Sequence, residues 1–217
     1  MAARARRGVV NERRPRQIVR PLEDPDRPRL FFAVPLPDDV REAIRPVRDA
    51  VQAAVGNGQA RIRWVRIESL HLTLRFLGPT SLDEAPALGA GADVVASKSA
   101  PFEIRIRGAG AFPAYGRPRT LWLGIEEGRA GLAALADGLA RSVPRLDGAA
   151  DDRPFSAHLT MARTDGLRLA EDAARALTEV AAGQEWAFTA DRMVLYRSHM
   201  GEGPAWYEPI HEALLRG

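Results

Sequence analysis

Apolar residues recur along this chain with the two periods that distinguish strands from helices. Leu30–Val34 is a continuous apolar run of strand length that ends at Pro35 and Pro37, as expected of a short buried strand. A helix should follow from the capping-box sequence at Asp39, and Pro46 should kink or divide it. Its apolar face is marked by residues three or four positions apart, namely Val40, Ala43, Ile44, Val47, Val51, Ala54 and Val55.

The series strand, helix, strand, helix, strand then repeats. The first copy has strands at 30–34, 71–77 and 102–107 and helices at 39–55 and 81–96, and the second has strands at 120–125, 158–163 and 186–196 and helices at 132–143 and 169–180. A Gly/Pro-rich loop at 108–118 separates the copies, and a last short strand is predicted at 206–210. We infer an internal duplication of about 80 residues. A pseudo-two-fold axis would bring equivalent strands together at the junction of two lobes, a usual place for a small-ligand site.

The middle strand of each copy carries the same motif. The two sequences are His71-Leu72-Thr73-Leu74 and His158-Leu159-Thr160-Met161. Because successive side chains of a strand point to opposite faces, each histidine shares a face with its threonine while the apolar residues face a core. The duplication therefore predicts two imidazoles and two hydroxyls around one cleft.

An arginine follows each motif. By alternation, Arg75 joins His71 on its face, where it is a candidate contact for a substrate. The same rule places Arg163 on the face opposite His158, and its role stays open. His199 and His211 have no matching threonine and are not expected to be catalytic.

Composition and charge divide the chain at its N-terminus. Residues 1–28 contain few large apolar side chains and many arginines, which predicts a disordered arm that is either a solvated extension or a tether for RNA. Residues 29–217 should form a single bilobal domain with halves at about 29–107 and about 119–198. The chain has no cysteine and no apolar run of membrane-spanning length. We expect a cytoplasmic monomer with no membrane association and no obligate protein partner.

The paired motifs suit acid–base chemistry on a phosphodiester. One histidine can act as a base and the other as an acid, each typically contributing about 10²–10⁴-fold in rate. Threonine hydroxyls two residues further on can donate hydrogen bonds to the non-bridging oxygens of a phosphate. Two histidines alone are a poor zinc set, and neither a nucleophile elbow nor a phosphate-binding glycine loop is present. No metal and no cofactor is expected.

Longer stretches around the motifs resemble one family. Arg63-Trp64-Val65, Glu68–Gly78, Gly110–Pro113, Leu121–Gly124 and His158–Arg163 are similar to the RNA 2′,3′-cyclic phosphodiesterases, also called 2′-5′ RNA ligases, of the 2H phosphoesterase superfamily. The resemblance covers roughly residues 29–212. One His-x-Thr is a weak signal, whereas two of them within a duplicated frame are specific.

The resemblance implies a fold, a reaction and roles. The fold would be α+β and bilobal, with two antiparallel sheets lining a central cleft and helices outside. The reaction would be hydrolysis of a terminal 2′,3′-cyclic phosphate of RNA, tRNA fragments among the substrates, to a 2′-phosphate. By motif order, His71 would be the proton donor to the leaving oxygen and His158 the proton acceptor that activates water. Thr73 and Thr160 would bind the phosphate.

Two features depart from the family pattern, and two other functions stay open. The family usually has proline just before the second histidine, where this chain has Ala157. The basic arm also lies outside the pattern. The same site would suit a phosphodiesterase acting on a small cyclic nucleotide or a cyclic ADP-ribose phosphate. It would also suit a module that binds RNA ends with little turnover.

Overall fold

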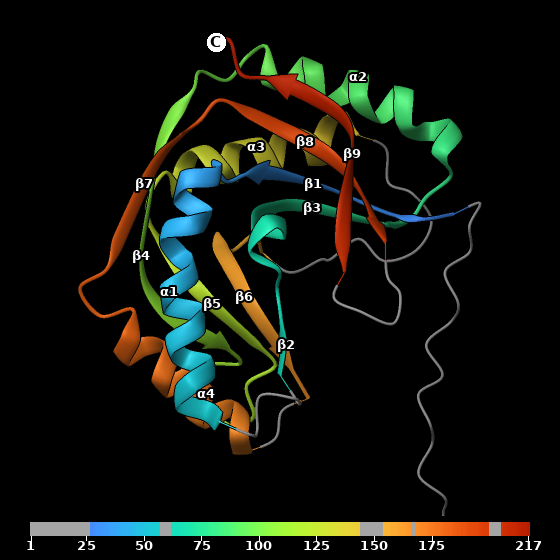
Figure 1. Cartoon of the computed structure of the whole chain (residues 1–217). Coiled ribbons are helices and arrows are strands. Elements are labelled where there is room, and N and C mark those ends of the chain that lie inside the picture. The colour runs from blue at the N-terminus through green and yellow to red at the C-terminus, as the bar shows by residue number, and fades with distance from the viewer. Residues whose placement is uncertain (1–26, 57–61, 144–153, 166–167, 200–204) are drawn as a thin grey trace, which may run out of the picture.

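The computed structural model describes residues 27–56, 62–143, 154–165, 168–199 and 205–217 (Figure 1). Nearly all of the predicted arm, residues 1–26, lies outside the described residues, and so does the polar segment 144–153. Within the described ranges, no helix combines the length and the apolar character needed to cross a bilayer.

The elements follow one another in the predicted alternation. In chain order they are β1 (Arg29–Pro35), α1 (Asp38–Val55), β2 (Ile62–Trp64), the 3₁₀ turn η2 (Ile67–Ser69), β3 (His71–Pro79), the 3₁₀ turn η3 (Leu82–Glu84), α2 (Ala85–Ala96), β4 (Phe102–Phe112), β5 (Thr120–Glu127), α3 (Arg129–Ser142), β6 (His158–Thr164), α4 (Arg168–Val180), β7 (Glu185–Ala190), β8 (Arg192–His199) and β9 (Trp206–Leu214).

The strands form two antiparallel sheets with helices on their outer faces. One sheet has the order β3-β1-β8-β9 and the other, which is curled, has the order β2-β6-β5-β4-β7 (Figure 1). Helices α2 and α3 pack together over the first sheet, and α1 and α4 pack together over the second. The predicted α+β class with two antiparallel sheets is confirmed.

Each copy of the repeat contributes strands to both sheets. β1 and β3 of the first copy pair with each other, as β5 and β6 of the second do. The strand that closes each copy, however, pairs with the other copy: β4 joins β5, and β8 joins β1. Each sheet also takes one helix from each copy as its cover. The motif strands β3 and β6 consequently occupy equivalent places in the repeated part of the two sheets, although β3 is an edge strand and β6 has β2 on its outer side. Cα atoms of β3 and β6 approach within 8 Å.

Helix α1 is continuous through Pro46, so a division of the helix, one of the two expected outcomes, is wrong, and the expected kink stays a prediction. A proline inside a helix costs about 3 kcal/mol or more. Burial of an aliphatic side chain contributes about 1.5–3 kcal/mol, and four such side chains offset the proline. The helix begins after Pro37 without a side-chain cap, so the capping box expected at Asp39 does not form. The four buried residues of the apolar face are Val40, Ile44, Val47 and Val51.

Strand β4 continues to Phe112, five residues beyond the predicted end of the strand. Gly108 has a φ of 75°, a conformation that side-chain-bearing residues rarely adopt. The pairing register with β5 is irregular between Ile106 and Ala109. Gly108 therefore lets the strand bend through an irregularity and go on, where the glycine content had predicted a loop.

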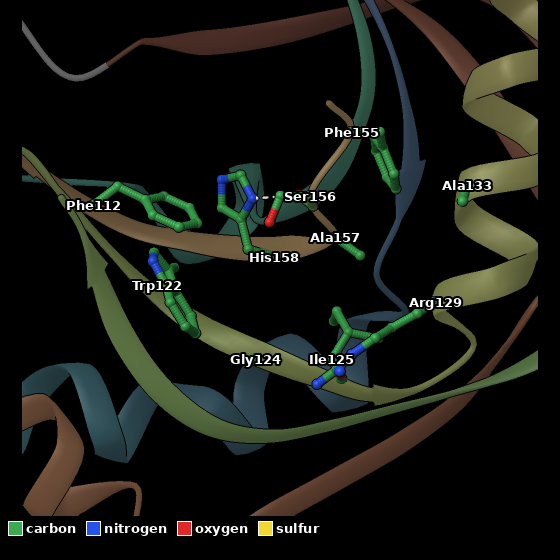
Figure 2. Close-up of a pocket in the computed structure, with 10 residues that line it drawn as sticks. All are labelled: Phe112, Trp122, Gly124, Ile125, Arg129, Ala133, Phe155, Ser156, Ala157 and His158. Carbon is green, nitrogen blue, oxygen red and sulfur yellow. Dashed lines mark hydrogen bonds between the residues drawn. The ribbon is translucent and has the colours of Figure 1, made fainter. Parts of the chain in front are cut away.

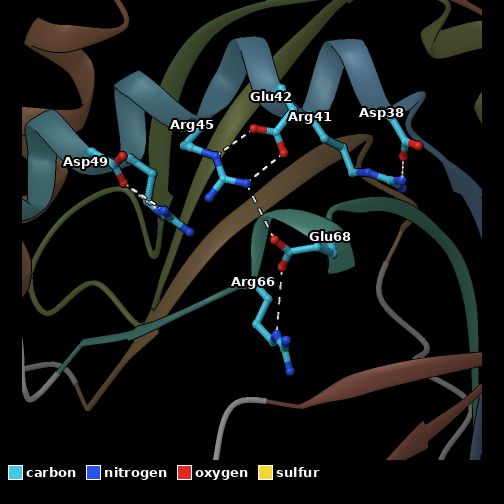
Figure 3. A network of polar contacts seen from close by, with 8 residues as sticks. Asp38, Arg41, Glu42, Arg45, Asp49, Arg66 and Glu68 are labelled. Carbon is cyan, nitrogen blue, oxygen red and sulfur yellow. Dashed lines mark hydrogen bonds and ion pairs between the residues drawn. The ribbon is translucent and has the colours of Figure 1, made fainter.

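Polar contacts join η2, which directly precedes the first motif, to α1 (Figure 3). The Arg45 guanidinium contacts Glu42 at 2.7 Å and Glu68 at 3.5 Å, and Arg66 lies 3.8 Å from Glu68. Exposed ion pairs of this kind contribute about 0–1 kcal/mol each. Burial of Ile67 must therefore supply most of the anchoring, and the charges fix the orientation of the turn.

Candidate active site

Both motif strands hold their histidine by the same backbone contact. The carbonyl of Ser69, at the end of η2, lies 2.8 Å from Nδ1 of His71, and the carbonyl of Ser156, just before β6, lies 2.7 Å from Nδ1 of His158. A carbonyl oxygen can only accept a hydrogen bond, so Nδ1 carries the proton in both rings. The neutral imidazoles are thereby fixed in one tautomer, and each Nε2 is left with its lone pair.

The threonines sit two residues after their histidines, at partly buried positions on the same face. The Thr73 hydroxyl lies 3.0 Å from His71 Nε2, to which it donates when the ring is neutral. The Thr160 hydroxyl makes no hydrogen bond within the part of the chain that the structure describes. The two hydroxyls are therefore equivalent in position and different in their contacts.

Aromatic rings enclose His71. Phe31 of β1 lies 4.9 Å from its ring centroid and Tyr207 of β9 lies 5.0 Å away, edge to face. Tyr196 of β8 completes this wall at 6.4 Å. Among the described residues, His158 has one such aromatic neighbour, Phe112 of β4, at 5.2 Å and also edge to face. The first imidazole is therefore packed on several sides, while the second borders an open cavity.

A β-bulge in β6 places Arg163 on the face of His158. Trp122 of β5 pairs with Thr160 and the next residue of β5, Leu121, pairs with Ala162, so Met161 is the extra residue. Such a bulge reverses the alternation of the residues that follow it. Arg163 is exposed, and its positive charge lowers the pKa of both motif histidines. The expectation that Arg163 lies opposite His158 is wrong, because strict alternation does not allow for a bulge.

A bulge at the matching point of β3 turns Arg75 away from His71. Phe32 of β1 pairs with Arg75 and Ala33 pairs with Thr73, so Leu74 is the extra residue. The Arg75 guanidinium donates to the carbonyls of Leu139 and of Val143, the latter at 3.1 Å, at the C-terminal end of α3. The expected shared face with His71 is corrected: Arg75 caps a helix on the opposite side of the sheet. The exposed Phe76 takes the position equivalent to Arg163.

Both imidazoles favour the neutral state. Burial is the main cause that lowers the pKa of His71, to about 4, and the charges of Arg163 and His158 add to it. Burial likewise lowers the pKa of His158, with Arg163 as a further cause. The influence of His158 and Arg163 on His71 shows that these side chains of the two sheets share one electrostatic environment.

Residues 36–202, which include both motifs and both bulges, match the model of the 2′-5′ RNA ligase superfamily. The chain belongs to that superfamily. The RNA 2′,3′-cyclic phosphodiesterase of Escherichia coli is 32% identical over 182 residues, covering 84% of this chain and 93% of that protein. The RNA 2′,3′-cyclic phosphodiesterase of Thermus thermophilus is 34% identical over 197 residues, covering 87% and 91%.

Solved structures give the same answer for the fold of this superfamily member. The structure of TT0787 of Thermus thermophilus has a TM-score of 0.69 at 29% identity and covers 87% of this chain and 98% of its own. Escherichia coli LigT complexed with 3′-AMP has a TM-score of 0.66 at 28% identity, with coverage of 88% and 99%. The bilobal fold that the resemblance implied is confirmed by these likenesses.

A cavity of about 460 Å³ opens beside His158 in this 2′-5′ RNA ligase superfamily member (Figure 2). Figure 2 shows the imidazole between the Phe112 ring and the Ser156 carbonyl, with Trp122 below. The Phe112 and Trp122 rings lie 5.1 Å apart, and the indole lies over Gly110, where any Cβ would come within 2.5 Å of it. The lining residues are Phe112, Trp122, Gly124, Ile125, Arg129, Ala133, Phe155, Ser156, Ala157 and His158.

The remaining histidines make contacts away from the motifs. His199 stacks on Trp206 at 3.9 Å and contacts Glu208 at 2.7 Å, and His211 contacts Asp93 of α2 at 2.9 Å. Across the described ranges, no three or more His, Asp or Glu side chains are grouped as a metal site would require. The strand that carries Tyr207 was predicted, but its contact with His71 was missed, since no sequence signal links residues so far apart.

Proposed function

We propose that this protein hydrolyses the terminal 2′,3′-cyclic phosphate of RNA to a 2′-phosphomonoester. The observation that carries the proposal is the pair of tautomer-fixed imidazoles, on β3 and β6, that share one electrostatic environment with Arg163. The relatives named RNA 2′,3′-cyclic phosphodiesterase support it, because two of them are 32% and 34% identical over most of this chain.

The proton transfers use the Nε2 atom of each ring, because Nδ1 of each ring is held by a carbonyl. His158 Nε2 would take a proton from the attacking water, while His71 Nε2 would give a proton to the 3′ oxygen as its bond to phosphorus breaks. In-line displacement needs these groups on opposite sides of phosphorus. Because the resting pKa of His71 is about 4, protonation of this ring depends on the bound phosphodiester, whose negative charge raises the pKa of a neighbouring base.

The anion would be held by three groups. The hydroxyls of Thr73 and Thr160 can donate to the two non-bridging oxygens, and the Arg163 guanidinium can neutralise the charge that develops in the transition state. When the phosphate binds, the Thr73 hydroxyl must turn from His71 Nε2 to an oxygen of the ligand. That change frees Nε2 for the proton that it transfers.

The cavity beside His158 fits the nucleoside of the reacting end. Its volume of about 460 Å³ lies in the range of ligand pockets, roughly 300–1,000 Å³. Phe112 is 38% exposed and offers a face on which a base can stack, with a contribution of about 1–3 kcal/mol. The base would therefore occupy the Phe112 side of the cavity, with its phosphate toward the histidines.

The test is a single incubation with an oligonucleotide that ends in a 2′,3′-cyclic phosphate, with saturating EDTA present. We expect a monoester that carries the phosphate on the 2′ oxygen, formed at the same rate with and without the chelator. A 3′-phosphate would reverse the assignment of the broken bond. Tight binding without turnover would favour a module that binds RNA ends, and turnover of only mononucleotides would favour a small cyclic nucleotide as substrate.

A further inference from the structure

Two arginines lie directly opposite each other on β2 and β6. Arg63 pairs with Arg163 in register, between the pairs Ile62 with Thr164 and Trp64 with Ala162. Cross-strand partners share a face of the sheet, with Cβ atoms about 4.5–5.5 Å apart. Both arginines are exposed, whereas Ile62 and Thr164 are buried. The two guanidiniums therefore project from the face that carries His158.

This pair has no carboxylate partner among the residues that the structure describes. Within the described part of the chain, neither Arg63 nor Arg163 makes an ion pair or a side-chain hydrogen bond. Elsewhere in the same sheet, Arg105 contacts Glu103 at 2.8 Å and both Glu127 and Glu185 at 3.2 Å. Like charges directly opposite on neighbouring strands are destabilising. Arg63 and Arg163 repel each other without a carboxylate to offset the repulsion, although Arg105 in the same sheet is paired with glutamates. This difference indicates that an anionic ligand binds between or beside the two arginines.

The position of Arg63 shows which anion it suits. Arg163 lies on the face of His158, and its charge lowers the pKa of both motif histidines. We therefore assign Arg163 to the reacting phosphate. Arg63 lies one strand further out, about 4.8 Å away in the sheet, on the edge strand β2. Phe112, on which the base would stack, lies in the same cross-strand row as the two arginines, because Phe112 pairs with Thr120, Thr120 with Arg163 and Arg163 with Arg63. A chain that leaves the site across the sheet, away from Phe112, would therefore pass Arg163 and then Arg63.

We propose that Arg63 binds the internucleotide phosphate on the 5′ side of the terminal nucleotide, so that the protein prefers oligonucleotides to mononucleotide cyclic phosphates. This inference rests on the proposed function for the identity of the reacting end. The guanidinium supplies a planar fork of donors that matches phosphate oxygens, and Arg163 beside it adds to the positive field.

The experiment compares two substrates that differ by one phosphate. The rate of hydrolysis is measured for two substrates, adenosine 2′,3′-cyclic phosphate and the dinucleotide ApA with a 2′,3′-cyclic phosphate. Each substrate is given to the unaltered full chain, to Arg63→Gln and to the control variant Arg216→Gln. Arg216 is exposed at the C-terminus, beside the end of α2. We expect Arg63→Gln to reduce the kcat/KM ratio of dinucleotide to mononucleotide by roughly tenfold, mainly through KM, and Arg216→Gln to leave that ratio unchanged.

Salt and a binding assay separate this subsite from the proposed function. For Arg63→Gln, the slope of log Kd against log salt for a dinucleotide 2′-phosphate should fall by about 0.7, the value for one contact to a single strand. The binding measurement tests the subsite even if no substrate is hydrolysed. Absence of hydrolysis would reject the proposed function and leave the subsite to be judged by binding. Equal losses for both substrates, or an unchanged salt slope, would overturn the subsite.

Discussion

The surroundings of His71 and His158 differ although the two strands hold their histidines alike. Each ring donates Nδ1–H to a serine carbonyl two residues earlier, and each strand bulges after its threonine. The first ring is packed among Phe31, Tyr196 and Tyr207. The second borders a cavity of about 460 Å³. The duplicated backbone thus fixes the orientation of both imidazoles, and their different surroundings would allow the two histidines to take the different roles proposed for them.

The position five residues after each histidine carries the sharpest difference. It is Phe76 after His71 and Arg163 after His158, and both side chains are exposed on the site face because of the bulges. One half of the site therefore offers an apolar surface and the other a cation. Under the proposed function, this difference would hold an asymmetric substrate in a single orientation, with Arg163 on one side of it and Phe76 on the other.

Removal of either imidazole should have the largest effect. His71→Ala and His158→Ala should each lower kcat by about 10²–10⁴-fold, since each ring would perform one proton transfer in the proposed mechanism. A cyclic substrate with sulfur in place of the 3′ oxygen separates the roles, because a thiolate leaves without a proton. Such a substrate should restore most of the activity of His71→Ala and little of that of His158→Ala. The reverse pattern would exchange donor and acceptor, and normal turnover in either variant would reject the mechanism.

Arg163 and Phe76 test the asymmetry directly. Arg163→Gln should lower kcat/KM by roughly ten- to a hundredfold, since a hydrogen bond to a charged group contributes about 1.5–3 kcal/mol. The matched variant Phe76→Leu, at the equivalent position, should lower it by less than about threefold, since it removes apolar contact only. Arg163→Lys should recover part of the loss by retaining the charge. Equal losses of kcat/KM at positions 76 and 163 would show that the positive charge of Arg163 does not contribute to catalysis.

The threonine variants should lose about as much activity as Arg163→Gln, and the two should differ in their pH dependence. Thr73→Val and Thr160→Val keep the β-branched shape and remove one hydroxyl each, so each should lose about ten- to a hundredfold in kcat/KM. Thr73→Val also removes the contact to His71 Nε2. The pH profile of kcat/KM should therefore shift for Thr73→Val and stay in place for Thr160→Val. Full activity in both variants would show that the threonine hydroxyls do not bind the phosphate.

The sequence could predict the strands and the motifs but not the side of the strand on which later residues lie. His71, Thr73, His158 and Thr160 precede the bulges, and alternation places them on one face. The arginines follow the bulges, so the same rule placed both on the wrong face. A bulge depends on how two strands pair, and no local pattern in β3 or β6 encodes it.

The exchange of strands between the copies was also beyond local patterns. Hydrophobic spacing gave the order of elements in each copy, because period and length are local properties. The pairing of β4 with β5 and of β8 with β1 joins elements of different copies. The aromatic wall of His71 comes from three strands far apart in the chain. The pKa of His71 could therefore not be inferred from its motif, which matches that of His158.

The last expected effect is on stability in acid rather than on activity, and it separates the two histidines without any substrate. The pKa of His71 is about 4 in the folded protein and near 6.5 when the ring is exposed to water. Between these values the unfolded chain binds more protons at this site, so the free energy of unfolding falls as the pH falls from 6.5 to 4. His71→Asn cannot titrate and should lose less stability over that interval than the unaltered protein. His158 borders the cavity and its pKa is lowered in the same direction, so His158→Asn should give a smaller difference of the same sign. The measurement is the urea midpoint at pH 7 and at pH 4.5 for the three proteins, because carboxylates common to all three cancel in the comparison. Identical acid losses in all three would mean that water reaches His71 freely, and the aromatic wall would then not distinguish the two halves of the site.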